Sequence, residues 1–209
     1  MNAEQEDFIK SHAVSRETIH SLSTYEKMLV EWSGKFNLVA ASTLPHIWTR
    51  HFADSAQLAR YIPANAKNLA DMGSGAGFPG LVLAIMRPDI DITLIEATGK
   101  KADFLQAVID ALELKASIRR ARIEDIHDLR VDVVTARALK ALPELMKYAS
   151  RLIHKDSLCL FPKGRNAVQE LTDAAKYWTF ECETHPSLSD DSGSVLVIKK
   201  PVYKSWRKS

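Results

Sequence analysis

Four glycines fall within the ten residues DMGSGAGFPG, Asp71 to Gly80, which lie between two apolar runs. Spacing of this kind matches both a dinucleotide-binding fingerprint and a shorter nucleoside-binding pattern. Both patterns need glycine, because the backbone turns sharply after a strand and a ligand must approach where Cβ atoms would otherwise stand. The stretch therefore predicts either a nucleoside or phosphate site, or a tight strand-to-helix turn without a ligand.

An acidic residue, Glu96, follows the glycines by about 20 residues, at the end of the next predicted strand. A carboxylate at that point of a nucleotide-binding fold accepts hydrogen bonds from both ribose hydroxyls. A strand precedes the glycines and a helix follows them, which favours the ligand-binding interpretation over a plain turn. The alternative for Glu96 is an ordinary loop residue that faces solvent.

The residues around the glycines favour S-adenosylmethionine over a dinucleotide. A pyrophosphate would sit on the first amides of the following helix, where Pro79 removes one N–H donor. Asp71 would also place a negative charge near that phosphate, whereas it suits the positively charged amino and sulfonium groups of S-adenosylmethionine. Asp71 can equally bond backbone amides of the turn, and the two roles are compatible.

The adenine of such a cofactor needs an apolar face and a hydrogen-bond acceptor. Ile123 and Glu124, just after the third predicted strand, offer both. A solvated helix start at Glu124 and Asp125 fits the same residues equally well.

The elements that must position these residues fall into two parts. Residues 1–62 lack strand alternation and predict a helical extension, with helices at 15–32 and 45–61. From 63 to 209 strands alternate with helices, which is typical of a doubly wound parallel sheet. The predicted strands are 68–72, 92–95, 117–120, 131–135, 158–161, 177–183 and 194–199. The predicted helices are 79–86, 100–114, 142–153 and 167–176.

The last two predicted strands have no helix between them, so we expect them to pair antiparallel. A mostly parallel, seven-stranded, Rossmann-like α/β sheet with an antiparallel C-terminal hairpin is typical of class I methyltransferases. It differs from the symmetrical two-half dinucleotide fold. The sequence thus predicts an N-terminal helical extension, 1–62, and a methyltransferase domain, 63–209.

Composition and charge narrow the classes of function. The 209 residues carry a net charge of +2, and the last eleven hold five basic residues and no acidic one. Such segregation of basic residues fits a nucleic-acid partner, and a solvated surface explains it as well.

We expect a cytoplasmic protein without membrane contact, because the N-terminus is polar and no apolar run approaches about 20 residues. Cys159 and Cys182 predict buried, reduced thiols, and no Cys/His cluster has metal-ligand spacing.

With these residues in place, the chain resembles the small-subunit rRNA methyltransferase G family, also called the glucose-inhibited division protein B family. The resemblance extends from about 36 to 164 and includes GFPG followed by Arg87-Pro88, which is more specific than the glycines alone. The other shared stretches are 36–38, 50–55, 99–101, 122–124, 136–138 and 163–164. Ala76 replaces a proline that is common in the family, and Lys101 often appears as arginine. Neither change removes a hydrogen-bonding group that the assignment needs.

The resemblance implies transfer of a methyl group from S-adenosylmethionine to N7 of the guanine at position 527, in the 530 loop of 16S rRNA. The partner is then 16S rRNA or the 30S ribosomal subunit, and we expect a monomeric enzyme without a metal. Taken with the glycine pattern, the expected cofactor-binding residues are Asp71, Gly73, Ser74, Gly75, Gly77, Phe78, Glu96, Ala97, Thr98, Ile123, Glu124 and Arg137. The implied RNA-facing residues are Arg50, His51, Lys100, Lys101 and Lys163.

Guanine N7 carries a free lone pair at neutral pH, so its methylation needs positioning rather than a general base. The chain lacks the Asn/Asp-Pro-Pro-aromatic turn typical of enzymes that methylate exocyclic amines. Arg137 is the candidate positioning residue and is directed at guanine O6 or a phosphate, since donation to N7 would block the lone pair. The alternative for Arg137 is a salt bridge with Asp71 or Glu124. For His51 the alternative is a role in the core or in helix capping.

Three other functions fit parts of the sequence: a small-molecule methyltransferase, a nicotinamide-dependent reductase and a non-catalytic RNA-binding module. A small-molecule enzyme would be expected to carry an apolar lid rather than the basic residues Lys100, Lys101 and Lys163. A non-catalytic module would have no need for the combination of Asp71, the glycines and Glu96.

Overall fold

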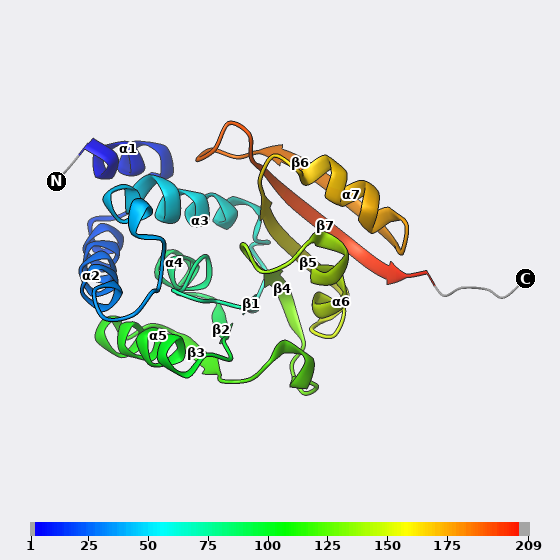
Figure 1. Ribbon diagram of the computed structural model, residues 1–209, viewed down its shortest axis with the longest axis horizontal. Helices are drawn as coiled ribbons and strands as arrows, with labels where there is room; N and C mark the ends of the chain where they lie inside the picture. Colours follow the sequence, from blue (N-terminus) through cyan, green and yellow to red (C-terminus); the bar gives the residue numbers. More distant parts are fainter. Residues whose placement is uncertain (1–2, 205–209) are drawn as a thin grey trace, which may run out of the picture.

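The structure, a computed structural model, describes residues 3–204 and is built on one seven-stranded sheet (Figure 1). The strand order is β3-β2-β1-β4-β5-β7-β6, in which β1 to β5 are parallel and β7 is antiparallel to both of its neighbours. The strands are β1 Asn68–Met72, β2 Asp91–Ile95, β3 Ala116–Arg119, β4 Val131–Thr135, β5 Ile153–Lys163, β6 Trp178–Pro186 and β7 Ser194–Tyr203. The predicted α/β sheet with its antiparallel C-terminal hairpin is confirmed.

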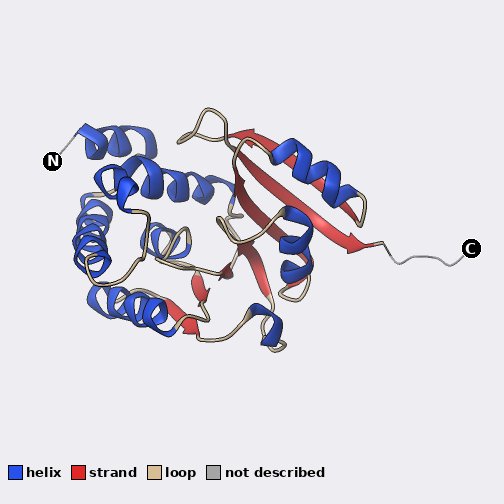
Figure 2. Cartoon of the chain, in the orientation of Figure 1, coloured by secondary structure: helices blue, strands red, loops and turns tan. Residues whose placement is uncertain are grey.

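Helices cover both faces of this sheet (Figures 1 and 2). On one face α4 (Gly80–Met86) and α5 (Gly99–Leu112) pack with the N-terminal helices around a first hydrophobic core. On the other face α6 (Leu142–Ala149) and α7 (Ala167–Ala175) pack over a second core. The central strands β1 and β4 are therefore buried on both sides, as is usual for parallel strands covered by crossover helices.

The N-terminal part consists of helices and turns, as predicted. Helix α1 spans Ala3–His12 and α2 spans Arg16–Ser33. Ser15 caps α2, because its side chain accepts a hydrogen bond from Thr18 N–H at 3.2 Å. A run of short helical segments follows: Ala41–His46, Trp48–Ala53, α3 Asp54–Ala56 and Gln57–Tyr61.

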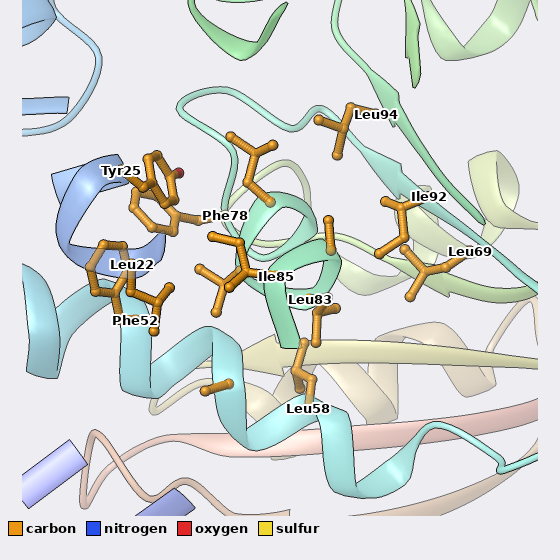
Figure 3. Close-up of a cluster of buried hydrophobic side chains, with 14 of the residues drawn as sticks. Leu22, Tyr25, Phe52, Leu58, Leu69, Phe78, Leu83, Ile85, Ile92 and Leu94 are labelled. Atoms are coloured by element: carbon orange, nitrogen blue, oxygen red, sulfur yellow. The ribbon is translucent and has the colours of Figure 1, made fainter. Parts of the chain in front are cut away.

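These N-terminal helices are part of the first core. Figure 3 shows Leu22 and Tyr25 of α2 beside Phe52 and Phe78, and all four side chains are buried. Burial of each such side chain stabilises the fold by about 1.5–3 kcal/mol. The hydroxyl of Tyr25 also donates to the carbonyl of Ala76, so α2 holds the glycine stretch directly.

Two predicted boundaries in the chain after β4, the end of α6 and the start of β5, were wrong. Helix α6 ends at Ala149 rather than at 153, and β5 begins at Ile153 rather than at 158. The pairing of β4 with β5 passes from Val131–Ile153 to Val133–Leu158, so the residues between them on β5 bulge. Residues 154–156 of this bulge are polar and exposed, which hides the start of the strand from any search for apolar alternation.

Candidate functional site

The glycine stretch forms the turn between β1 and α4, at the carboxyl end of the central strand. Gly73, Gly75 and Gly77 have φ angles of +65°, +58° and +98°, a region that other residues rarely adopt. A Cβ atom at Gly73 would lie 2.7 Å from the Leu139 side chain, whereas one at Gly75 would have no neighbour closer than 3.8 Å. The backbone therefore favours glycine at all three positions, and Gly75 borders open space.

Asp71 supports this turn from within the sheet. Its side chain is fully buried and accepts hydrogen bonds from Thr135 Oγ1 at 2.8 Å and from Gly80 N–H at 3.2 Å. Burial raises the pKa of Asp71 to about 6, and these hydrogen bonds oppose the shift. A Cβ atom at Gly80 would lie 2.8 Å from the carboxylate, which explains the glycine there. Of the two expected roles the structure shows the bonding of the turn, and contact between Asp71 and a cofactor stays a prediction.

Glu96 is fixed beside the same turn. One carboxylate oxygen accepts a hydrogen bond from Gly75 N–H at 2.9 Å and the other from Thr98 N–H at 2.7 Å. Each oxygen keeps a lone pair for a further donor, since a carboxylate offers about four acceptor sites. Glu96 thus presents two preorganised acceptors, which is the arrangement that a pair of ribose hydroxyls requires.

A hollow of about 430 Å³, called the cofactor hollow below, opens beside Glu96 and has a size typical of small-molecule sites, roughly 300–1,000 Å³. The predicted residues that line it are Gly73, Gly75, Glu96, Ala97, Ile123, Glu124 and Arg137. The predicted residues outside its lining are Asp71, Ser74, Gly77 and Phe78, which are buried, and Thr98, which is exposed. Leu139, Lys140 and Tyr148 also line the hollow, and sequence reasoning missed them.

Tyr148 of α6 is a lining residue that no sequence motif marks. Its hydroxyl donates to Glu144 Oε1 at 3.3 Å, one turn earlier in the helix. The nearby carboxylate of Glu124, together with partial burial and the carboxylate of Glu144, raises the pKa of Tyr148 to about 12, so the phenol stays protonated at neutral pH. Tyr148 of α6 therefore lines the cofactor hollow together with Glu124, the candidate adenine acceptor.

Glu96→Ala is expected to weaken binding of S-adenosylhomocysteine by about 1.5–3 kcal/mol, because the two acceptors predicted to meet the ribose hydroxyls are lost and charge-assisted hydrogen bonds lie in that range. Titration calorimetry measures the dissociation constant. Glu31→Ala, which removes an exposed carboxylate from α2, is the matched control and should bind like the wild type. An unchanged dissociation constant for Glu96→Ala would place the ribose contact elsewhere.

Arg137, two residues after β4, is held by the N-terminal part of the chain. Its Nη1 donates to Asp54 Oδ2 at 3.1 Å and to the Arg50 carbonyl at 3.2 Å, and its Nη2 donates to His51 Nδ1 at 2.8 Å. The guanidinium also lies over the Phe78 ring, 4.9 Å from its centroid. The structure thus brings Arg137 together with Arg50 and His51, which the sequence placed in a separate RNA-facing group.

The carboxylate that pairs with Arg137 is Asp54, so the alternative partners Asp71 and Glu124 were wrong. Asp71 is unsuited to this pairing because its oxygens already accept hydrogen bonds from Thr135 and from the backbone of the turn. Asp54 lies 83 positions before Arg137 in the sequence. The only sequence feature that links Asp54 to other candidate residues is the stretch RHFADS, which also contains Arg50 and His51.

His51 is a buried member of this arrangement, which confirms the core role given as its alternative. Its Nδ1 accepts from Arg137, a side chain with donors only, so Nε2 carries the proton and donates to Thr43 Oγ1 at 2.9 Å. Burial, reinforced by the charge of Arg137, lowers the pKa of His51 to about 4. The ring stacks on Phe78 with centroids 4.7 Å apart. Contact between His51 and RNA stays a prediction.

A second hollow of about 470 Å³, called the neighbouring hollow below, lies next to the cofactor hollow, and the segment Arg137–Lys140 lines both. Asp54, Lys163 and Asp190 belong to its other walls. Ala138 in the shared segment has a φ of +51°, which is unfavourable for an alanine. The segment Arg137–Lys140 thus forms the wall that the two hollows share.

Lys163 at the end of β5 holds the shared segment. Its Nζ lies 2.7 Å from Glu170 Oε2 and donates to the Lys140 carbonyl at 2.8 Å. Glu170 in turn accepts a hydrogen bond from Leu142 N–H at 2.7 Å. The Lys163 side chain is only 9% exposed, so its predicted contact with RNA would require it to leave these partners.

The other RNA-facing candidates lie around the two hollows. Lys100 is exposed at the start of α5, with its ammonium group 4.9 Å from the centroid of the Phe36 ring. Lys101 lines the cofactor hollow, and Arg50 is exposed. The end of the basic C-terminal tail, residues 205–209, lies outside the described residues.

Within residues 3–204 no group of three His, Cys, Asp or Glu side chains could hold a metal ion. Cys159 is buried, as predicted, and burial raises the pKa of its thiol to about 12. Cys182 on the edge strand β6 is only half-buried, so its predicted full burial was wrong. In the same described part of the chain, no helix combines the length and apolar character that a membrane span needs.

Comparison of the sequence with known proteins gives one family. The family model described as rRNA small subunit methyltransferase G matches residues 18–194. The ribosomal RNA small subunit methyltransferase G of Rhodospirillum centenum is 46% identical, over 93% of this chain and 89% of its own length. The protein of the same name from Paramagnetospirillum magneticum is 43% identical, over 93% of this chain and 95% of its own.

Solved structures share the fold. An O-methyltransferase from Bacillus cereus, crystallised in complex with SAH, has a TM-score of 0.58 and 15% identity, covering 85% of this chain and 91% of its own. A ribosomal protein L11 methylase from Lactobacillus delbrueckii has a TM-score of 0.56 and 12% identity, covering 70% of this chain and 76% of its own. At these identities the likeness concerns the fold alone, and it confirms the predicted class I methyltransferase fold.

Proposed function

The chain belongs to the rRNA small subunit methyltransferase G family, as its motifs indicated, and from this premise we propose that it methylates N7 of one guanine in 16S rRNA. The enzyme is an S-adenosylmethionine-dependent rRNA methyltransferase. The proposal adds the acceptor, which is the guanine at position 527 in the 530 loop, presented by 16S rRNA or by the 30S subunit.

One observation carries this proposal: the segment Arg137–Lys140 lines both the cofactor hollow and the neighbouring hollow. Group transfer becomes fast when the two reacting atoms are held in contact and in line. Two hollows that share a wall provide this closeness, one for the cofactor and the other for a base taken out of its stack.

The residues of the cofactor hollow fit S-adenosylmethionine. Glu96 offers two acceptors for the ribose hydroxyls, and Ile123 offers an apolar face for the adenine. The open space at Gly75 lets a ligand approach the backbone closely. When bound, S-adenosylmethionine supplies an electrophilic methyl group on a sulfonium ion.

The part left to the protein is positioning, because guanine N7 is a nucleophile without deprotonation. Arg137 is proposed to hold the guanine by donating to O6 or to a phosphate, which leaves the N7 lone pair free. Glu96 and the glycine turn are proposed to hold the other reactant. The neutral state of His51 fits this scheme, since no step requires it to transfer a proton.

The proposed function is tested by mapping modified nucleosides of 16S rRNA by mass spectrometry. Cells that lack the protein should lose one 7-methylguanosine, at position 527, and regain it when the wild-type gene is restored. A complete set of modifications in cells without the protein would contradict the proposal. Calorimetry with S-adenosylhomocysteine and with NADH addresses the nicotinamide alternative, and only the former is expected to bind.

Replacing Lys100 and Lys101 together by alanine is expected to raise KM for 30S subunits, because each is proposed to contact a phosphate. Each lost contact should flatten the log–log dependence of RNA binding on salt by about 0.7–0.9. Filter binding over a salt series measures this slope, and calorimetry checks cofactor affinity, since Lys101 lines the cofactor hollow.

The matched control for the lysine pair replaces Lys67 and Lys115, which lie next to the opposite, amino-terminal ends of β1 and β3. This control removes the same charge and should leave the slope unchanged. A slope that is unchanged for Lys100 and Lys101 as well would make them part of a solvated surface.

We also propose that the enzyme acts as a cytoplasmic monomer and that residues 1–62 and 63–209 fold as one unit. Support for the single unit comes from the first core, which contains Leu22 and Phe52 from one part and Leu69 and Ile92 from the other.

A further inference from the structure

We propose that Asp54 is a positioning residue for Arg137, and that Ser189 in the loop between β6 and β7 fixes Asp54 for this task. The inference rests on the proposed function, because Arg137 is the residue proposed to contact the guanine. It comes from hydrogen bonds that join three parts of the chain: the N-terminal helical segments, the turn after β4 and the C-terminal hairpin.

The two carboxylate oxygens of Asp54 accept hydrogen bonds from three side chains. Oδ2 accepts from Arg137 Nη1 at 3.1 Å, and Oδ1 accepts from Ser189 Oγ at 2.7 Å and from Gln57 Nε2 at 3.0 Å. The side chains of Arg137 and Asp54 are 17% and 18% exposed. A charge-assisted hydrogen bond that is partly shielded from water holds its geometry better than an exposed ion pair. Asp54 is thus placed to fix the direction of the guanidinium.

Gln57 anchors the loop that carries Ser189. Its side chain is buried, its Oε1 accepts from Leu188 N–H at 2.9 Å, and its Nε2 also donates to Ser187 Oγ at 3.2 Å. The loop therefore has a fixed attachment to the N-terminal helical segments at the point where Asp54 meets Arg137. Ser189 is the loop residue whose hydroxyl reaches the carboxylate that pairs with Arg137.

The same hydrogen bonds leave part of the Arg137 guanidinium unused. Nη1 donates twice and Nη2 once, and across residues 3–204 the Nε–H and the second Nη2–H have no hydrogen-bond partner. Guanine O6 and phosphate oxygens accept such donors. Because Asp54 and His51 already restrain the side chain, less freedom is lost when these remaining donors meet the substrate. This is the physical gain that a positioning residue provides.

Asp54→Asn is expected to lower turnover at saturating 30S subunits about 10- to 100-fold, with a smaller change in KM, because a charge-assisted hydrogen bond is lost. Ser189→Ala should lower it less, about 3- to 10-fold, since only the support of Asp54 is removed. Ser192→Ala is the matched control in the same loop, because its hydroxyl bonds Asp190 rather than Asp54. It should turn over like the wild type.

A double-mutant cycle separates positioning from a general structural role. If Asp54 acts through Arg137, then Asp54→Asn should have no further effect on turnover once Arg137 is alanine. If Asp54 has only a general structural role, the loss of turnover in the double variant should instead equal the product of the losses in the two single variants. Thermal unfolding shows whether each variant folds. If Asp54→Asn does not fold, Ser189→Ala combined with Arg137→Ala makes the same test.

The outcomes distinguish this inference from the proposed function. Multiplied losses in the cycle, or wild-type turnover in both Asp54→Asn and Ser189→Ala, would overturn the positioning role and leave the methyltransferase activity standing. A wild-type protein that methylates neither naked 16S rRNA nor 30S subunits would overturn the proposed function, and the positioning role with it.

Discussion

Arg137→Ala is expected to lower the rate of methyl transfer at saturating 30S subunits about 10²- to 10³-fold. Arg137 lines both hollows and is held by Asp54, His51 and the Arg50 carbonyl. Truncation removes the donors proposed for guanine O6 or phosphate, so N7 is no longer held in line with the methyl group. The measurement is single-turnover transfer of a labelled methyl group to 30S subunits that lack the modification.

Two further variants test why the rate falls in Arg137→Ala. Arg137→Lys keeps the charge but loses the planar fork of donors, so most of the loss in rate should remain. Arg16→Ala at the exposed start of α2 removes the same charge elsewhere and should leave the rate unchanged. Normal turnover of Arg137→Ala, with only KM for 30S subunits raised, would make Arg137 an RNA-binding residue without a role at the reacting centre.

Gly75→Val is expected to reduce cofactor affinity below what calorimetry detects. The φ of Gly75 is +58°, where a β-branched residue is strongly disfavoured, and a Cβ atom would point into open space beside the hollow that Gly75 lines. The branched side chain would occupy the space proposed for the ligand. It would also disturb the Gly75 N–H that donates to Glu96.

The matched control is Gly99→Val at the start of α5. A Cβ atom there meets nothing within 4 Å, and Gly99 is not among the residues with positive φ. Gly99→Val should bind S-adenosylhomocysteine like the wild type, and thermal unfolding of both variants checks that they fold. Equal affinity in Gly75→Val and the wild type would show that the cofactor binds elsewhere.

The features that sequence alone predicted are those set by local spacing and strand order. Glycines that end one strand and a carboxylate that ends the next must meet at the same edge of a parallel sheet, and Gly75 N–H does donate to Glu96. The antiparallel end of the sheet followed from two strands without a helix between them. Periodicity and connection type carry this information before any contact is known.

Features that depend on contacts between distant parts of the chain could not be predicted. The pairs Arg137–Asp54 and Asp54–Ser189 join residues 83 and 135 positions apart, and no local pattern specifies them. Lys163 illustrates the converse case, because a lysine in a basic stretch suggests an exposed RNA contact, yet tertiary packing gives it Glu170 and a backbone carbonyl. The sequence shows which residues are charged, but it does not show which residues they pair with in the folded chain.

The most direct test combines the purified protein, S-adenosylmethionine with a deuterated methyl group, and 16S rRNA or 30S subunits from cells lacking the protein. Nuclease mapping by mass spectrometry then locates the label. One labelled 7-methylguanosine at position 527, formed by the wild type and strongly reduced with Arg137→Ala, is the expected result. Label on another atom or nucleotide, or no label on either naked rRNA or 30S subunits, would contradict methylation of guanine N7 at this site.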